Sequence, residues 1–136
     1  MGNIQAIQSL KKVSFEDIID TVYKSNNTYL LINTLPITEQ DCLLLHTIPI
    51  SREEGTINQL LTTNKMHPII IYGKNTGDLS VLAKYKQLSK LGFSEIMVYP
   101  GGMFEWLLLQ EAYGQEMFPT TTEPKDMYAF RPIRTL

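Results

Sequence analysis

The chain has 136 residues, a formal net charge of −2, 43% hydrophobic residues and 19% charged residues. These values predict one compact domain with its own hydrophobic core, and they exclude a chain that is disordered through its composition. Twelve basic residues face fourteen acidic ones. Because nucleic-acid binding needs a surplus of positive charge, the sequence argues against a nucleic-acid partner.

The cysteine content and the apolar runs indicate where the protein resides. The single cysteine, Cys42, excludes an internal disulfide and a cysteine-rich zinc site, so we expect a reducing compartment, no metal and no cofactor. No apolar run approaches the ~20 residues that span a bilayer, which predicts a cytoplasmic protein without a transmembrane segment. Lipid anchoring at Gly2 is a minor alternative, because Ala6 stands where the acylation pattern prefers Ser or Thr.

The first half of the chain predicts two helices around a buried strand. A helix over about 14–24 begins at the N-cap Ser14, with acidic residues in its first turn. A continuous apolar run at 28–32 then predicts a buried strand. We expect a loop with a short helical turn up to the short strand Ile48-Pro49-Ile50, followed by a helix from Ser51 to Asn64.

The second half of the chain has the clearest strand pattern. Four β-favouring residues stand together at 69–72 and again at 96–99. A helix over 79–91, capped by Asp78, lies between them and ends at Gly92. A short helix over 103–112 is expected to bury its apolar residues in the core, namely Phe104, Trp106, Leu107, Leu108 and Leu109. Strands that alternate with helices at this spacing predict an α/β domain with a parallel sheet and right-handed crossovers.

The loop after Tyr72 is the predicted site, because ligands of open parallel sheets bind beyond the carboxyl ends of the strands. A chain that turns there into a helix start exposes backbone N–H groups, which favour a bound anion. We expect this loop to hold an anion with roughly millimolar affinity. Its glycine spacing is that of neither a P-loop nor a dinucleotide-binding turn. The loop residues are Gly73, Lys74, Asn75, Thr76, Gly77 and Asp78.

A series of landmarks in order resembles a rhodanese-like domain. The strand at 69–72 precedes a loop, a helix ending in Gly92-Phe93, the strand at 96–99, Gly101-Gly102, and Trp106 four residues later. Val13-Ser14, the strand near 30–33 and Ile48-Pro49 match earlier landmarks of the family. The resemblance covers about residues 13–112 and leaves 1–12 as a lead-in and 113–136 as an extended tail packed on the domain. It implies a parallel central sheet flanked by helices.

The departures from the family pattern bear on function. In its sulfur-transferring members, the residue directly after the central strand is the cysteine that carries a persulfide, and the loop N–H groups stabilise the thiolate. That position here is Gly73, and the loop contains neither a thiol nor an arginine. The resemblance therefore implies no catalytic residue. It implies a catalytically inactive rhodanese-like domain that acts as a protein-binding or structural module for an unidentified protein partner.

Two alternatives to this reading stay open. One is a sulfurtransferase or a phosphatase-like enzyme that uses Cys42 as a non-standard nucleophile, although Cys42 stands beside three leucines and is expected to be buried. The other is a domain that binds a small anion without turning it over.

The remaining candidate residues have ordinary structural explanations. His46 and His67 lack metal-ligand spacing and are expected at the surface or at strand ends. Glu53 and Glu54 are explained by the positive end of a helix dipole. A further candidate, a modest basic face that would dock a partner, consists of Lys84, Lys86 and Lys90.

Overall fold

Three parallel strands form the centre of the molecule. The computed structural model describes residues 10–23, 28–124 and 127–132, so the lipid-anchoring prediction at Gly2 lies outside the described residues. The strands are β1 (Leu30–Asn33), β2 (Ile69–Tyr72) and β3 (Ile96–Tyr99), in the spatial order β1-β2-β3. Ile69 of β2 pairs with Leu30 on one side and Ile96 on the other. Every residue of β2 and β3 is buried, as the apolar runs predicted.

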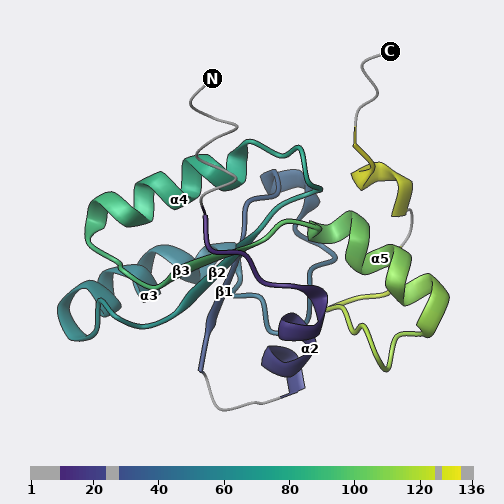
Figure 1. Cartoon of the computed structure of the whole chain (residues 1–136), viewed down its shortest axis with the longest axis horizontal. Coiled ribbons are helices and arrows are strands. Elements are labelled where there is room, and N and C mark those ends of the chain that lie inside the picture. The colour runs from purple at the N-terminus through teal and green to yellow at the C-terminus, as the bar shows by residue number, and fades with distance from the viewer. Residues whose placement is uncertain (1–9, 24–27, 125–126, 133–136) are drawn as a thin grey trace.

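Helices cover both faces of the sheet (Figure 1). On one face lie α2 (Phe15–Tyr23) and α5 (Gly102–Tyr113), and on the other lie α3 (Ile50–Thr63) and α4 (Ser80–Leu91). The predicted α/β fold, with a parallel sheet flanked by helices, is confirmed. Among the described helices, none combines the length and the apolar character needed to cross a membrane.

Each face of the sheet has its own hydrophobic core, because neighbouring strand residues point to opposite faces. Ile70 and Tyr72 of β2 join the cluster below α2 and α5, whereas Ile69 and Ile71 join the cluster below α3 and α4. Trp106 belongs to the first cluster with no exposed surface, and its Nε1 donates to the carbonyl of Pro119 at 3.1 Å. The prediction that Trp106 lies in the core is confirmed.

Local signals in the sequence fix several helix ends. The backbone N–H of Ser14 donates to the Asp17 carboxylate at 2.9 Å, and the Ser14 hydroxyl donates to the same oxygen at 3.2 Å. This pairing ties the residue before α2 to its first turn. After α4, Gly92 adopts φ +108°, which is the left-handed conformation predicted for a C′ glycine.

The strand predicted at Ile48-Pro49-Ile50 is wrong. The N–H of Ile48 donates to the carbonyl of Leu31 at 2.9 Å, which is a single contact along the edge of β1. Pro49 has no N–H with which to extend a ladder, and the chain turns directly into α3 at Ile50. A similar isolated pairing joins Lys12 to Val98 of β3, so each edge of the sheet is covered by a short stretch of chain.

The segment after α5 lies against the chain that precedes α3. Thr120 pairs with Leu44, and the N–H of Thr121 donates to the carbonyl of Leu43 at 2.8 Å. The sequence analysis expected an extended tail packed on the domain, and within the described residues this tail also contains the 3-10 helix η2 (Met127–Phe130). Another 3-10 helix, η1 (Ile37–Glu39), is the short helical turn expected in the loop after β1.

Candidate functional site

The loop at 73–78 is held at the carboxyl end of β2 by the first turn of α5. The carbonyl of Gly73 accepts the N–H of Met103 at 2.9 Å, and the carbonyl of Lys74 accepts the N–H of Phe104 at 2.8 Å. Gly102 makes this approach feasible. Its φ is +63°, and a Cβ there would lie 2.4 Å from the carbonyl oxygen of Gly73, so that only glycine fits without a shift.

The carboxylate of Asp78 turns back into its own loop. Its Oδ2 accepts the N–H of Lys74 at 2.8 Å. Its Oδ1 accepts the N–H of Ser80 at 3.0 Å and the Ser80 hydroxyl at 2.6 Å. Asp78 therefore binds the first N–H of α4, which begins one residue later than predicted, and places a full negative charge inside the loop.

Other acceptors of the chain occupy further loop N–H groups. The side-chain oxygen of Asn75 accepts the N–H of Gly77 at 2.9 Å, and the carbonyl of Asn75 accepts the N–H of Asp78 at 3.2 Å. The side-chain amide of Asn75 donates to the carbonyl of Phe130 at 2.9 Å, which joins the loop to η2. An added anion would have to compete with these internal acceptors. Anion binding at 73–78 stays a prediction.

The space beside Gly73 is already filled. A Cβ at this position would lie 2.4 Å from Asp78 Oδ2, 2.8 Å from Val81 Cγ2 and 2.9 Å from Thr34 Oγ1. A Cβ atom does not approach other heavy atoms this closely without something shifting, so a cysteine at Gly73 would require its neighbours to move. The sequence identified Gly73 as the family's cysteine position. It gave no sign that a carboxylate fills the vacated volume.

Two polar residues that the sequence analysis did not place at the site border this loop. The hydroxyl of Thr34 is 2.7 Å from the Ser80 hydroxyl, so the end of β1 is tied to the start of α4. Glu39 Oε2 is a buried atom that lies 3.4 Å from Lys74 Nζ in an ion pair without hydrogen-bond geometry. Lys74, the loop's single cation, therefore has a carboxylate neighbour. Thr34 directly follows β1. Its position at the carboxyl end of a strand is the sequence feature from which its place at the site could have been predicted.

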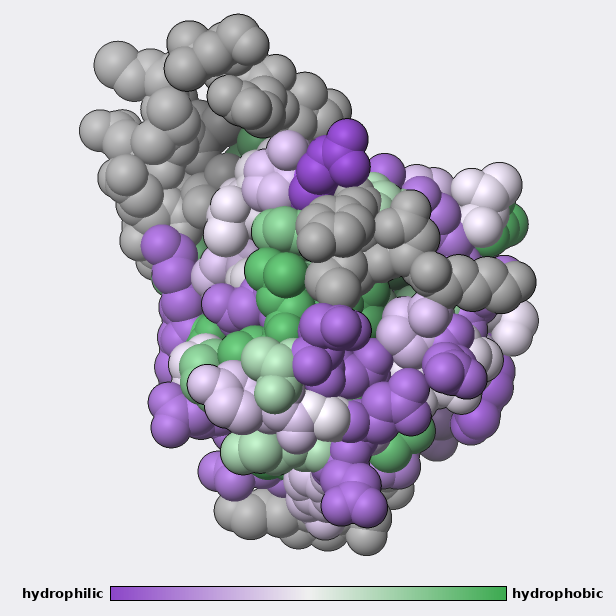
Figure 2. Space-filling view, turned by 90° about the vertical axis from the view of Figure 1, so that its right-hand side faces the viewer, coloured by the Kyte–Doolittle hydropathy of each residue, from purple (hydrophilic) through white to green (hydrophobic). Residues whose placement is uncertain are grey.

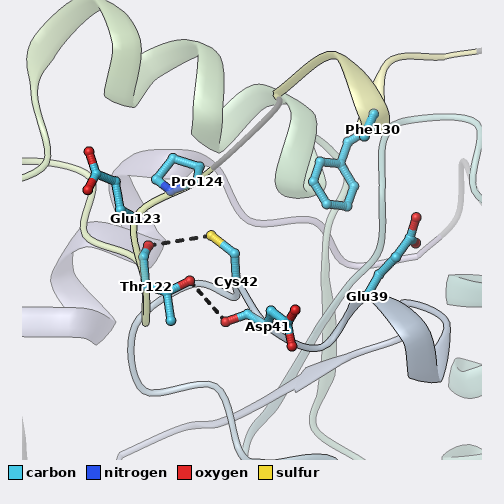
Figure 3. Close-up of a pocket in the computed structure, with 8 residues that line it drawn as sticks. Glu39, Asp41, Cys42, Thr122, Glu123, Pro124 and Phe130 are labelled. Atoms are coloured by element: carbon cyan, nitrogen blue, oxygen red, sulfur yellow. Dashed lines mark hydrogen bonds between the residues drawn. The ribbon is translucent and has the colours of Figure 1, made fainter.

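Cys42 lies in a pocket of about 200 Å³ beside this loop (Figure 3). Its thiol donates to the carbonyl of Thr122 at 3.6 Å, and the carbonyl of the preceding Asp41 accepts the Thr122 hydroxyl at 3.0 Å. The expectation of a buried core cysteine is wrong, because Cys42 is partly exposed. The leucines that follow enter the core, but the chain turns at 41–42 to pair with the tail.

The pocket around Cys42 carries acidic groups. Glu39, Asp41 and Glu123 line it together with Pro124 and Phe130. Reactive cysteines lie beside Lys, Arg or protonated His, or at a helix N-terminus. No Lys, Arg or His is among the described residues that line the pocket. The geometry thus shows an accessible thiol without the cationic neighbours that activate one.

Two buried tyrosines end the strands next to the site. The Tyr72 hydroxyl lies 2.6 Å from Thr47 Oγ1 and accepts the N–H of Leu44 at 3.2 Å. Burial raises the pKa of Tyr72. The Tyr99 hydroxyl donates to Glu105 Oε1 at 2.6 Å, and burial, followed by this carboxylate, raises the pKa of Tyr99. Both phenols therefore stay protonated at neutral pH and serve as anchors.

The other candidates from the sequence do not join the loop. Glu53 Oε2 accepts Lys84 Nζ at 2.7 Å, so this pair links α3 to α4 and removes Lys84 from the expected basic face. His46 is exposed and His67 is half-buried, as expected, but both line one cavity with Arg52. Within the described ranges, no cluster of three His, Cys, Asp or Glu residues is arranged to hold a metal ion.

The surface on the α5 side exposes hydrophobic side chains in a patch surrounded by polar ones (Figure 2). In and after α5, Leu108, Tyr113 and Met117 are exposed. The sequence analysis expected the apolar residues of this helix to be buried, which holds for Trp106 and Leu107 and fails for Leu108.

Comparison with known proteins gives a clear fold assignment. No protein-family model and no curated protein matches the sequence. Among solved structures, the single-domain sulfurtransferase RDL2 of Saccharomyces cerevisiae aligns with a TM-score of 0.57 and 18% identity, over 77% of this chain and 94% of RDL2. The rhodanese-like domain of the Alr3790 protein from Anabaena aligns with a TM-score of 0.50 and 16% identity, over 92% of both chains.

A further structure of the Alr3790 protein aligns with a TM-score of 0.56 and 17% identity, over 79% of this chain and 89% of that one. The chain therefore has the fold of rhodanese-like domains, and the predicted resemblance is confirmed at the level of the fold.

Proposed function

We propose that this chain is a catalytically inactive rhodanese-like domain that serves as a protein-binding or structural module. The observation that carries the proposal is the filled position at the end of β2. Where the sulfurtransferases that the chain resembles have a cysteine, Gly73 is packed against Asp78, and Asp78 Oδ2 binds the N–H of Lys74. One loop donor thus serves an internal carboxylate, and no thiolate is there to accept sulfur.

Two further observations bear on the protein partner and on the cytoplasmic location. Exposed apolar side chains on and after α5, including Leu108 and Met117, offer contact area for a protein partner. A cytoplasmic location agrees with a single unpaired cysteine.

A second candidate function is sulfur transfer through Cys42. One observation favours it: the thiol is accessible in a pocket that shares Glu39 with the loop, since Glu39 also pairs with Lys74. The acidic lining argues against it. In this function Cys42 would take the outer sulfur of thiosulfate, release sulfite, and pass the sulfur to cyanide as thiocyanate.

A thiosulfate and cyanide assay distinguishes the two functions. The proposal predicts that the wild-type protein and Cys42→Ser both give thiocyanate at the buffer rate, and that Gly73→Cys stays at that rate because Asp78 obstructs the new thiol. Turnover by the wild-type protein that Cys42→Ser abolishes would establish the second function in place of the first.

A further inference from the structure

A second cavity lies at the opposite end of β2 from the loop at 73–78. It has a volume of about 500 Å³ and opens between the start of β1 and α3. Leu30, the first residue of β1, lines the cavity together with Tyr29 directly before it. His67 lines it from the turn before β2. Natural ligand sites span about 300–1,000 Å³, so this cavity has the size of a site for an organic molecule, whereas the pocket at Cys42 is smaller.

One positive charge lines this cavity, and no negative charge among the described lining residues opposes it. Arg52 in the first turn of α3 lines it together with His46 and His67, the two histidines of the chain. No Asp or Glu is among the described residues that line it. The acidic neighbour of Arg52 in sequence, Glu53, is held by Lys84 at 2.7 Å between α3 and α4. In a chain of net charge −2, this cavity is a local site of positive charge.

The hydrogen-bond donors here are available to a ligand. Within the part of the chain that the structure describes, the Arg52 guanidinium and the imidazoles of His46 and His67 make no hydrogen bond or ion pair. A guanidinium presents a planar fork of donors that fits a carboxylate or phosphate, and a neutral imidazole adds one N–H. Beside them, Ile48 and Leu60 supply apolar wall.

The backbone at His46 is in a conformation that few side chains adopt. Its φ is +71°, the single positive φ of a non-glycine residue among the described residues. Such a conformation is costly for a residue with a Cβ, and it places the His46 ring at the cavity. His46 thus adopts a mildly strained backbone conformation that glycine would adopt at lower energetic cost.

We propose that this cavity, the Arg52 cavity, binds a small organic molecule through a phosphate or carboxylate group. Arg52 pairs with the oxyanion, His46 and His67 donate further hydrogen bonds, and the organic part lies against Ile48 and Leu60. The cavity has room for an organic part beside the oxyanion, and no Asp or Glu among the described lining residues is there to recognise a cation.

An NMR titration of amide shifts with three matched probes tests this proposal. Phenyl phosphate and benzoate carry the two candidate groups on the same ring, and benzyl alcohol is the uncharged control. At low ionic strength, at least one of the two anions is expected to shift the amides at 46–48, 52–60 and 67, and the tighter binder identifies the recognised group. No response to either anion, or an equal response to the alcohol, would overturn the proposal.

Two variants sharpen the test, with Lys90→Gln as a matched loss of charge elsewhere. Arg52→Gln is expected to weaken binding about tenfold or more, since it removes a charge-assisted contact. His46→Gly removes the imidazole, and glycine adopts φ +71° without steric cost, so the variant is expected to fold. It too is expected to weaken binding. Wild-type affinity in Arg52→Gln, or an equal loss in Lys90→Gln, would contradict the assignment. The loop at 73–78 is not involved, so the result is independent of its inactivity.

Discussion

The carboxylate of Asp78 occupies the space that a side chain at Gly73 would need. A Cβ at Gly73 would be 2.4 Å from Asp78 Oδ2, and this same oxygen accepts the N–H of Lys74 at 2.8 Å. A larger residue at position 73 and the present position of the Asp78 carboxylate are therefore mutually exclusive. An anion added to the predicted loop would therefore compete with this internal carboxylate for the N–H of Lys74.

The first prediction is an energetic coupling between these two residues. Gly73→Ala is expected to cost about 1–3 kcal/mol in the free energy of unfolding, because the added methyl overlaps Asp78 and Val81. In the double variant with Asp78→Ala, the loss is expected to be smaller than the sum of the single losses by at least about 0.5 kcal/mol. Urea denaturation measures all three free energies.

Gly55→Ala is the control for this coupling. A Cβ at Gly55 in α3 meets nothing within 4 Å, so this substitution is expected to stabilise the helix by about 0.5–1 kcal/mol. Additivity of Gly73→Ala and Asp78→Ala within about 0.3 kcal/mol would show that the two positions do not compete for space.

The second prediction concerns anions at the loop. Asp78→Ala removes the internal carboxylate and frees the N–H of Lys74. We therefore expect sulfate to shift the amides at 74–77 at lower concentration in this variant than in the wild-type protein. The control is Asp41→Ala, which removes a carboxylate from the neighbouring Cys42 pocket. Unchanged sulfate affinity in Asp78→Ala would mean that the carboxylate does not block the loop.

The third prediction is the stability contribution of Trp106. Its ring is fully buried, with ring centroids 6.3 Å from Tyr99 and 5.1 Å from Phe118. Trp106→Ala is expected to cost on the order of 3–5 kcal/mol in chemical denaturation, since it leaves a cavity and a carbonyl at Pro119 without its donor. The exposed Leu108 on the same helix is the comparison: Leu108→Ala should cost less than about 1 kcal/mol. A similar small loss for Trp106 would place its ring outside the core.

The fourth prediction is a loss of stability in alkali. Burial and Glu105 raise the pKa of Tyr99 above its unfolded value, which is about 10. The folded state therefore holds this proton more tightly, so its contribution is complete below about pH 10 and falls as the pH rises above that value. The free energy of unfolding of Tyr99→Phe should decline less steeply above pH 10 than that of the wild-type protein. The exposed Tyr113→Phe should keep the wild-type slope, and equal slopes in all three proteins would contradict the assignment.

Much of the fold could be predicted from short-range patterns. The strands at 69–72 and 96–99 were located to the residue, because uniform burial on both faces selects continuous β-favouring runs. Gly92 marked the end of α4 for a local reason, its positive φ. The strand predicted at Ile48-Pro49 was wrong although its composition is typical of a strand. The segment makes one hydrogen bond to the edge of β1, at Leu31, before the chain enters a helix, and this long-range contact is not encoded in the local sequence.

The position of the candidate loop at a strand end could be predicted from the sequence, whereas its internal contacts could not. The loop after Tyr72 follows from the rule on strand ends, and Gly73 from the resemblance. The turn of the Asp78 carboxylate toward Lys74 depends on how the loop folds back, which no spacing encodes. Likewise, His46 and His67 are 21 positions apart and share a cavity because β1 and β2 are neighbours in the sheet.

The most direct test of the central claim is the intact mass of the protein after incubation with thiosulfate, followed by removal of the free donor without reducing agent. We expect the wild-type mass to be unchanged, because Gly73 offers no thiol and the N–H of Lys74 is bound to Asp78. A gain of one sulfur atom that maps to Cys42 and is absent in Cys42→Ser would contradict the account and identify the chain as a sulfur carrier.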